Sequence, residues 1–382
     1  MISSLHRPTL AKVDLSAISE NIEQVVSHIP KQVQTFAVVK ANAYGHGVAA
    51  VLPTLQQGEQ QADGIGVATF MEALEARQLG WNKTIGLIEG AFTADEWQLA
   101  IEHDISCVIH HEPQLIWALE KTPPTTSATR VVWLKYNTGM NRLGFNDQTL
   151  LPAAKRLHKA GFQLILTTHF ANADDCAHPL NAIQIQRFND MLQTLRETVN
   201  SDVEGSLCNS AGIVNFPEHH HDWVRPGIML YGSTPVTDKS ARDLDLQPAM
   251  DFSAQIIALQ PVNAGDGIGY GSRWTAMQDT KTALVSIGYG DGYPRVVSAD
   301  AYVSVIDDTN NQSYPCAVIG RVAMDMIVID VSAVPNSVAL NSKVLLWGDA
   351  PHVDEVAAHA ETISYELLCR LSARPTRNIT ES

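Results

Sequence analysis

The sequence predicts an N-terminal (β/α)₈ barrel, an α/β fold of TIM type, followed by a C-terminal mostly-β domain. In the first two-thirds of the 382 residues, short apolar segments alternate with amphipathic helical segments, which is typical of a parallel sheet covered by helices. After residue 240, short β-branched segments follow one another with turns between them, which indicates antiparallel strands. We expect the barrel over 13–240, and the β domain over 241–382 together with an N-terminal strand in 1–12.

Eight segments are expected to form the barrel strands, because each is a short and nearly continuous apolar run. In chain order they are TFAVV, GIGVAT, TIGLI, SCVI, RVVWLKY, LILTTHF, GSLCNS and WVRPGIMLYG. Between strands, Val48, Leu52 and Leu55 share one face of a helix, and Thr93 with Glu96 predicts a capping box. A doubly wound sheet is the rival architecture, but no glycine fingerprint follows the first strand to favour it.

The C-terminal strands are expected at DFSAQIIAL, KTALVSIGYG, AYVSVID, PCAVIG, MIVIDVS and KVLLWG. Turn signals separate these segments, and no long helix lies between them, so they predict a compact antiparallel β domain or barrel. Residues 354–372 then have a helical pattern.

Composition excludes several classes of function. The formal charge is 26 minus 41, or −15, which argues against binding nucleic acid. No segment has the length of a membrane span, and the N-terminus lacks the apolar core of a signal peptide, so we expect a cytoplasmic protein without a membrane partner. Five scattered cysteines give no metal spacing, and EHHHDW, which contains His219–His221, predicts an exposed loop. We therefore expect no metal site.

Polar side chains stand at the ends of several predicted barrel strands. Lys40 ends the first strand, Lys135 the fifth and His169 the sixth. Asn209 and Ser210 end the seventh strand, and Arg225 belongs to the eighth. Catalytic groups of such barrels sit at the C-terminal ends of the strands, so these side chains are expected to share one mouth.

The chemistry predicted for this mouth is that of an amine meeting a carbonyl. A neutral lysine attacks carbonyl groups, and the aldehyde cofactor that most often uses this reaction is pyridoxal 5'-phosphate. Barrels usually hold a phosphate with the loops after strands seven and eight. The small residues after Asn209 and after Arg225, SAG and PGI, offer free backbone N–H groups there.

The sequence as a whole resembles the alanine racemase family. The motifs that carry the resemblance are AVVKANAYGHG, KYNTGMNRLGF, THFANAD, LCNSAG, VRPGIMLYG, GIGYG, IGYGDGYPR, GRVAMDM and TISYELLCR, in the family's order. The resemblance covers nearly the whole chain and implies a homodimeric isomerase with shared active sites. It implies interconversion of L-alanine and D-alanine, with D-alanine supplied to peptidoglycan.

The resemblance implies a role for each matching residue. Lys40 would hold the cofactor covalently and act as one base at the substrate Cα, and Tyr270 of the partner subunit would act as the second base on the opposite face. Arg225 would face the pyridine nitrogen, where a protonated arginine weakens the ring as an electron sink. The cofactor would further contact Tyr44, His169, Asn209, Ser210, Gly227, Ile228 and Tyr365.

Other matches concern the substrate and the walls of the site. Arg142 and the backbone N–H of Met324 would bind the substrate carboxylate. Lys135, Asp325 and Tyr289 would support the site, Tyr289 either at the substrate entrance or as a half-buried residue of the β domain. Lys135 matches a lysine that is often carbamylated in the family, whereas a chloride ion or a water is the alternative group beside Arg142.

Departures from the family leave some questions open. Asn137 stands where many members have aspartate, and Ala323 stands where a cysteine is common. Alternatives to alanine racemisation are a racemase of broader specificity that accepts serine or larger amino acids, and a pyridoxal-phosphate-dependent decarboxylase. GIGYG, TISYELLCR and an arginine at the ring nitrogen argue against decarboxylation. A non-enzymatic cofactor carrier would be a lone barrel, which the large C-terminal domain argues against.

Overall fold

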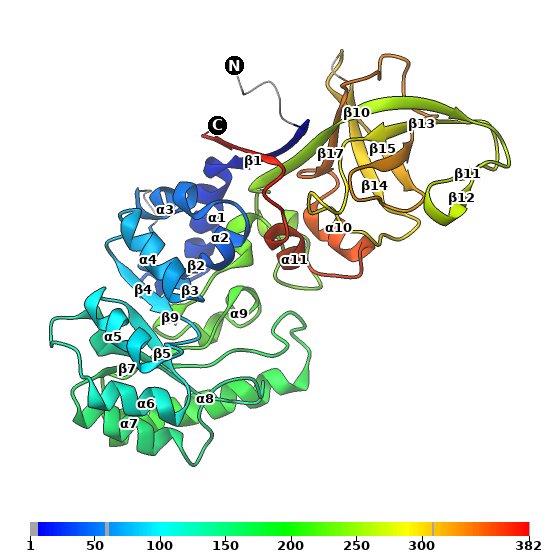
Figure 1. Ribbon diagram of the computed structural model, residues 1–382. Helices are drawn as coiled ribbons and strands as arrows, with labels where there is room; N and C mark the ends of the chain where they lie inside the picture. Colours follow the sequence, from blue (N-terminus) through cyan, green and yellow to red (C-terminus); the bar gives the residue numbers. More distant parts are fainter. Residues whose placement is uncertain (1–6, 58–60, 308, 382) are drawn as a thin grey trace. The chain divides into compact units, whose positions relative to one another are not determined.

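A computed structural model describes residues 7–57, 61–307 and 309–381. The chain divides into two compact units, one of them Ile18–Gln247 and the other formed by the chain up to Ala17 together with Pro248 onward. The first unit is a parallel barrel wrapped by helices, and the second is mostly β (Figure 1). The predicted fold class is therefore confirmed.

The barrel consists of eight parallel strands in the order β8-β7-β6-β5-β4-β3-β2-β9. Their bounds are β2 (Gln34–Val38), β3 (Gly64–Val67), β4 (Thr84–Leu87), β5 (Ser106–Ile109), β6 (Val131–Lys135), β7 (Gln163–Thr167), β8 (Glu204–Ser206) and β9 (Trp223–Val224). Two backbone hydrogen bonds close the ring between its two ends: the Asp222 N–H donates to the Gly205 carbonyl at 3.0 Å, and the Arg225 N–H to the Cys208 carbonyl at 2.9 Å.

Helices cover the outside of these strands, as Figure 1 shows for α3 to α8. The helices of the barrel unit are α1 (Leu15–Ser27), α2 (Lys40–Tyr44), α3 (Val48–Gln57), α4 (Phe70–Gln78), α5 (Ala94–Glu102), α6 (Glu112–Glu120), α7 (Leu150–Lys159), α8 (Pro179–Thr198) and α9 (Ser210–Asn215). Of the two hydrogen bonds in the capping box predicted for α5, one forms. Thr93 Oγ1 accepts from the Glu96 N–H at 3.1 Å, but the Glu96 carboxylate accepts from the Phe92 N–H at 2.7 Å. Among the described residues, no helix combines the length and apolar character that crossing a membrane requires.

The aromatic ring of Phe36 fills part of the barrel interior, and three glycines leave the space for it. Phe36 packs against Trp133 with ring centroids 4.6 Å apart. A Cβ at Gly86 would lie 2.6 Å from Phe36 Cζ, and Cβ atoms at Gly64 and Gly66 would meet the same ring at 2.9 and 2.7 Å. The glycines of β3 and β4 thus make the space that Phe36 of β2 occupies.

Gly86→Ala is expected to lower the free energy of unfolding by about 1–3 kcal/mol, because the added methyl group overpacks the barrel interior. Equilibrium unfolding in urea measures this loss. In a Phe36→Leu background the same substitution should be less destabilising, because the clashing ring carbon is absent. Equal losses in both backgrounds would show that the glycine serves another purpose.

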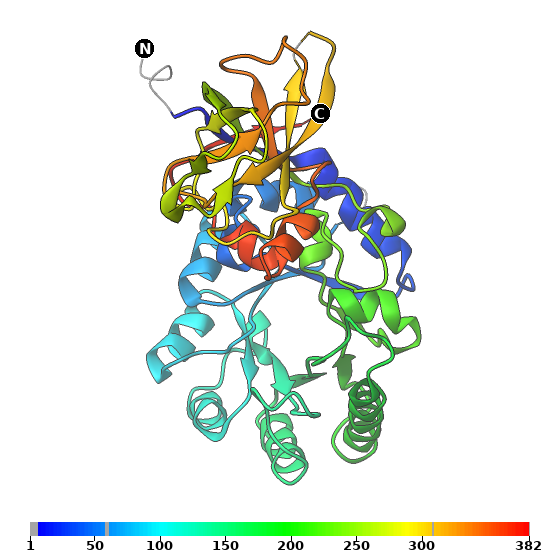
Figure 2. The same cartoon turned by 90° about the vertical axis from the view of Figure 1, so that its right-hand side faces the viewer.

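The second unit contains an antiparallel barrel with two added strands. The ring runs β13-β16-β15-β14-β17-β10 and closes by pairing of β10 with β13, while β1 and β18 extend the sheet from β10. Figure 2 shows the strands of this unit, coloured from yellow-green to orange. The bounds are β1 (Thr9–Asp14), β10 (Met250–Val262), β13 (Thr280–Val285), β14 (Tyr302–Asp307), β15 (Gln312–Ile319), β16 (Ile327–Asp330), β17 (Lys343–Trp347) and β18 (Thr376–Thr380), with the small ribbon β11 (Gly267–Ile268) and β12 (Trp274–Thr275).

The helical pattern predicted over 354–372 is two helices rather than one. They are α10 (Val353–His359) and α11 (Ser364–Cys369). The chain turns between them at Glu361, whose φ is +53°, a left-handed conformation that ends a right-handed helix.

Candidate active site

Lys40 begins a left-handed turn at the C-terminal end of β2. The four residues after it, Ala41–Tyr44, have φ between +50° and +56°. Each L-residue in this conformation costs about 1–2 kcal/mol, so neighbours must hold the turn. The Asn42 side chain accepts from the Val48 N–H at 2.9 Å, and the Glu72 carboxylate accepts from the Ala41 N–H at 2.8 Å. The sequence indicated a turn of small residues here. It indicated neither the left-handed conformation of the turn nor the hydrogen bond from the Ala41 N–H to Glu72.

Ala41→Val should lower the free energy of unfolding by about 1–2 kcal/mol, because a β-branched side chain tolerates the left-handed region poorly. Ala41→Gly should raise it by up to about 1 kcal/mol. Ala49→Val on α3 is the matched control, since Ala49 is also exposed but should cost only its helix propensity, about 0.5 kcal/mol. Urea unfolding compares the three variants, and equal losses for the two valines would contradict strain at Ala41.

Tyr44, Ser210 and Gly227 meet on the same side of the barrel mouth. The Gly227 N–H donates to Ser210 Oγ at 2.8 Å. A Cβ at Gly227 would lie 3.0 Å from the Tyr44 phenol oxygen, so glycine leaves the room between them. Asn209 caps α9 by accepting from the Gly212 N–H at 3.0 Å, and Ile228 begins the short 3₁₀ helix Ile228–Tyr231. This group brings the hydroxyls of Tyr44 and Ser210 to one side of the mouth, and hydroxyl donors suit an anionic ligand.

The Arg225 guanidinium is buried and held by barrel carbonyls. Its Nη2 donates to the Thr168 carbonyl at 2.7 Å and to the Leu207 carbonyl at 3.1 Å, and its Nη1 donates to the Ser206 carbonyl at 2.8 Å. Burial lowers the pKa of Arg225 to about 10, which leaves the group protonated at neutral pH. These bonds fix its orientation.

His169 marks the place where the positive side chains of the mouth converge. Burial lowers the pKa of His169 well below its ordinary value, and nearby cations lower it further. In order of effect they are Lys135, Arg225, Arg142 and Lys40. His169 is therefore neutral at neutral pH. Burial also lowers the pKa of the Lys135 amine, with Arg225 and Arg142 adding to the shift.

Asn137 organises the loop that carries Arg142. Its side-chain oxygen accepts from the Gly139 N–H at 3.2 Å and the Asn141 N–H at 3.0 Å, and its amide donates to Asn141 Oδ1 at 3.1 Å. A small cavity of about 10 Å³ lies in this region, with Lys135, Arg142 and His169 among its lining residues. This volume is close to the minimum for one water molecule.

The remaining predicted residues belong to the C-terminal unit. Tyr270 begins a 3₁₀ turn between two glycines of positive φ, and its side chain is 72% exposed. A Cβ at Gly271 would lie 3.8 Å from the Arg321 guanidinium, two residues before Ala323. The Tyr289 N–H donates to the Ala323 carbonyl at 3.1 Å, and the Gly290 N–H to the Met324 carbonyl at 2.9 Å. The structure thus places Tyr270, Tyr289 and Met324 in one region of this unit.

Charged side chains that sequence reasoning missed hold the Met324 segment. The Asp291 carboxylate, whose side chain is 0% exposed, pairs with Arg7 at 3.1 Å and with Arg374 at 3.3 Å. Arg374 also bonds the Asp325 carboxylate at 2.7 Å, and Arg7 donates to the Asp325 carbonyl. Arg7 and Asp291 are 284 residues apart in the sequence, so no local pattern could have indicated the pair. Tyr365 is the second residue of α11 and also belongs to this unit.

The described residues include no group of three or more histidine, cysteine or acidic side chains placed to hold a metal ion. The histidine triplet is not an exposed loop, however, and that expectation was wrong. His220 is buried at 2% exposure, and its Nε2 lies 3.1 Å from the Ile213 carbonyl. The Ile213 carbonyl of α9 is the partner of this nitrogen, whereas Nδ1 has no hydrogen-bond partner among the described residues.

Comparison with known proteins gives the same family over both units. Residues 13–235 match the family model "Alanine racemase, N-terminal domain", and residues 249–379 match "Alanine racemase, C-terminal domain". The chain is 52% identical over 371 residues to an alanine racemase of Psychrobacter sp. (strain PRwf-1), covering 96% of this chain and 98% of that one.

Solved structures agree with this match. The biosynthetic alanine racemase from Pseudomonas aeruginosa superposes with a TM-score of 0.90 at 40% identity, covering 98% of this chain and 100% of that chain. The alanine racemase from Bartonella henselae with covalently bound pyridoxal phosphate has a TM-score of 0.83 at 26% identity, covering 98% and 99%. This chain belongs to the alanine racemase family.

Proposed function

We propose that this protein interconverts L-alanine and D-alanine with pyridoxal 5'-phosphate as its cofactor. The observation that carries the proposal is the grouping of cationic side chains in the barrel mouth. Lys135, Arg142 and His169 line one small cavity, and Lys40 and Arg225 also lower the pKa of His169. A site of this composition suits an anionic substrate and an anionic cofactor. Membership of the alanine racemase family supplies the substrate and the reaction.

The donor set of the mouth fits the proposed cofactor. Tyr44 and Ser210 bring hydroxyls beside a glycine whose missing Cβ leaves room at the Tyr44 phenol, which suits a phosphate. Lys40 supplies the amine, and Arg225 is the cation proposed for the ring nitrogen. The remaining proposed cofactor contacts are Asn209, Gly227, Ile228, His169 and Tyr365. When bound, the cofactor would supply an aldehyde that reacts with amines and a ring that stabilises negative charge at the substrate Cα.

We assign the proton transfers to two side chains of different type. The Lys40 Nζ removes or returns the Cα proton on one face of the substrate, and the Tyr270 phenol does so on the other. Two bases on opposite faces are what inversion of a centre requires. Arg142 and the Met324 N–H hold the substrate carboxylate so that Cα stays between the two bases. Lys135, Asp325 and Tyr289 support these groups.

The proposed active form is a homodimer in which each site uses Lys40 of one subunit and Tyr270 of the other. Large apolar side chains of the C-terminal unit are exposed, among them Tyr270 at 72%, Met277 at 91% and Met324 at 52%. Exposed apolar side chains that lie in one region, as Tyr270 and Met324 do, are typical of an interaction surface. Light scattering at assay concentration tests this proposal, and an active monomer would overturn it.

As a biosynthetic enzyme the protein would supply D-alanine for peptidoglycan, and a cytoplasmic location belongs to the same proposal. The biosynthetic role is supported by the likeness to the Pseudomonas aeruginosa structure.

A single reaction in D₂O tests the catalytic proposal. Purified protein, pyridoxal phosphate and L-alanine are incubated while optical activity and deuterium at Cα are followed together. We expect optical activity to disappear as deuterium enters Cα. If deuterium enters Cα while optical activity is retained, the second base is not part of the mechanism. If neither optical activity nor deuterium content changes, alanine is not the substrate.

A further inference from the structure

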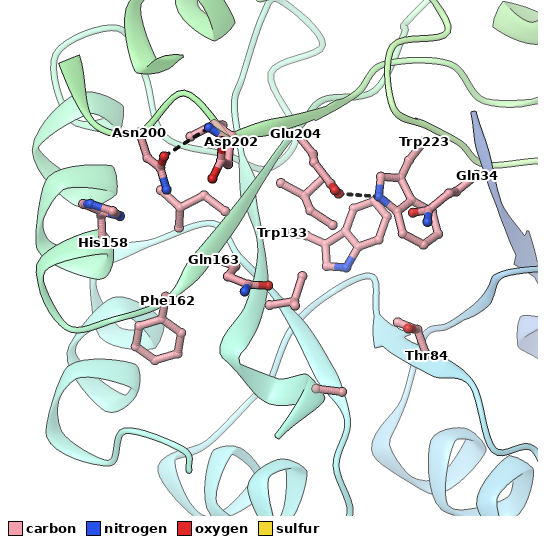
Figure 3. A pocket seen from close by; sticks show the side chains of 15 residues that line it. Gln34, Thr84, Trp133, His158, Phe162, Gln163, Asn200, Asp202, Glu204 and Trp223 are labelled. Carbon is pink, nitrogen blue, oxygen red and sulfur yellow. Dashed lines mark hydrogen bonds between the residues drawn. The ribbon is translucent and has the colours of Figure 1, made fainter. Parts of the chain in front are cut away.

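A second cavity opens at the N-terminal ends of the barrel strands, opposite to the end that carries Lys40 (Figure 3). Its volume is about 370 Å³, within the range of small-molecule sites. The first residues of six strands line it: Gln34, Thr84, Val131, Gln163, Glu204 and Trp223. Val131 and Lys135 are four residues apart on β6, so the cavity lies about 13 Å below the catalytic mouth.

The inner wall of the cavity is aromatic, and its rim is polar. Trp133, Trp223 and Phe162 are buried, with at most 7% exposure, whereas the side chains of His158, Gln163 and Asp202 are exposed. Trp133 and Trp223 meet edge to face with centroids 5.5 Å apart. A ligand that enters past the rim would therefore contact indole rings.

One polar group of this wall has no hydrogen-bond partner among the described residues. Trp133 is 2% exposed, and none of those residues accepts a hydrogen bond from its indole Nε1. In Figure 3 this nitrogen lies on the side of the ring remote from the hydrogen bond in which Trp223 donates to Glu204 at 2.6 Å. A buried donor without an acceptor is costly and calls for an explanation. Trp347 shares this property but does not line the cavity.

The charges that line the cavity are negative. Asp202 and Glu204 contribute carboxylates, and no lysine or arginine is among the described lining residues. Outside the lining, the Arg130 guanidinium lies 5.5 Å from the Phe162 ring centroid, so Trp133 and Trp223 are the rings left for a ligand. His158 is the other titratable side chain of the lining. Indole faces attract cations through their quadrupole, and they do so more strongly where water is excluded. Carboxylates next to aromatic rings thus select for positive charge.

We propose that this cavity is a binding site for a small organic cation that carries a hydroxyl or carbonyl oxygen. The cationic head, a quaternary ammonium or a protonated amine, would rest against Trp133 and Trp223 near the carboxylates of Glu204 and Asp202. The oxygen would accept from the Trp133 Nε1–H. The site does not depend on the proposed racemase chemistry, because none of its residues belongs to the catalytic mouth.

Choline is the probe, since it combines a quaternary ammonium with one hydroxyl. The cofactor-loaded enzyme is labelled with ¹⁵N at its tryptophan indoles, and Trp133→Phe identifies the Trp133 resonance. We expect choline to shift this resonance saturably. The neutral isostere 3,3-dimethylbutan-1-ol, which lacks the charge, and propyltrimethylammonium, which lacks the hydroxyl, should each bind about tenfold more weakly.

Calorimetry on rim variants provides a test that does not rely on Trp133→Phe. The double variant Asp202→Asn with Glu204→Gln should weaken choline binding about tenfold or more, with racemase activity unchanged. Glu197→Gln is the matched control, because this exposed carboxylate on α8 does not line the cavity, and it should leave choline affinity intact.

Three results would overturn the proposal: a Trp133 resonance that stays in place at every soluble choline concentration, equal affinity for choline and its neutral isostere, or full choline affinity in the double variant. The first would mean that the donor meets no ligand of this class. The other two would mean that charge plays no part in recognition.

Discussion

Tyr270→Phe is expected to lower racemisation about 10²–10⁴-fold in both directions, because the ring remains but the proton-transferring oxygen is lost. Exchange of the Cα proton with solvent should survive for one enantiomer, since Lys40 still serves its own face. Deuterium incorporation measured separately from L-alanine and D-alanine shows this asymmetry. Loss of exchange from both enantiomers, or retention from both, would contradict a two-base site.

Lys40→Ala provides the complementary loss. Dialysis should remove the cofactor, because the amine that anchors it is absent. Without the cofactor, exchange should stop for both enantiomers although Tyr270 is intact. Absorbance of the dialysed protein reports cofactor retention without any activity measurement.

Mixing the two variants tests whether each site is built from two chains. In a heterodimer of Lys40→Ala and Tyr270→Phe subunits, one site would combine an intact Lys40 with the partner's intact Tyr270. Random subunit exchange after unfolding and refolding should therefore restore about one quarter of wild-type activity. If Lys40 and Tyr270 act within one chain, the mixture stays as inactive as the separate variants.

The barrel strands and the barrel part of the site could be predicted from the sequence for one physical reason. Buried parallel strands must be continuously apolar, so a lysine or arginine at the end of such a run stands out. Lys40, Lys135 and Arg225 were found in this way, and the structure places them near one another around His169. Asp291 offered no such signal, because its partners come from the two distant ends of the chain.

Local conformation was less predictable wherever tertiary contacts override propensity. Ala41–Tyr44 form a left-handed turn although alanine favours a right-handed helix, because Asn42 and Glu72 bond backbone groups of the turn and of its flank. His220 was expected in an exposed loop, yet its ring is buried, with Nε2 3.1 Å from the Ile213 carbonyl of α9. Both outcomes depend on residues that the sequence pattern does not connect.

The buried Asp291 carboxylate is expected to be the most sensitive position of the C-terminal unit. It joins Arg7 and Arg374, and it accepts from the Gly288 N–H at 2.9 Å. Asp291→Asn removes the charge that both arginines face, which should lower the free energy of unfolding by about 2–4 kcal/mol. Urea unfolding measures the loss.

Asp325→Asn is the control for this prediction, because Asp325 meets the same Arg374 but has a side chain that is 47% exposed. An exposed pair of this kind contributes less than about 1 kcal/mol, so the two variants should differ clearly in stability. If Met324 binds the substrate carboxylate as proposed, Asp291→Asn should also raise KM for alanine more than it lowers kcat, because the arginines that hold the Met324–Asp325 turn lose their common partner. Equal stability of the two variants would mean that burial adds nothing to the Asp291 ion pairs. An unchanged KM in a folded Asp291→Asn variant would separate this network from substrate binding.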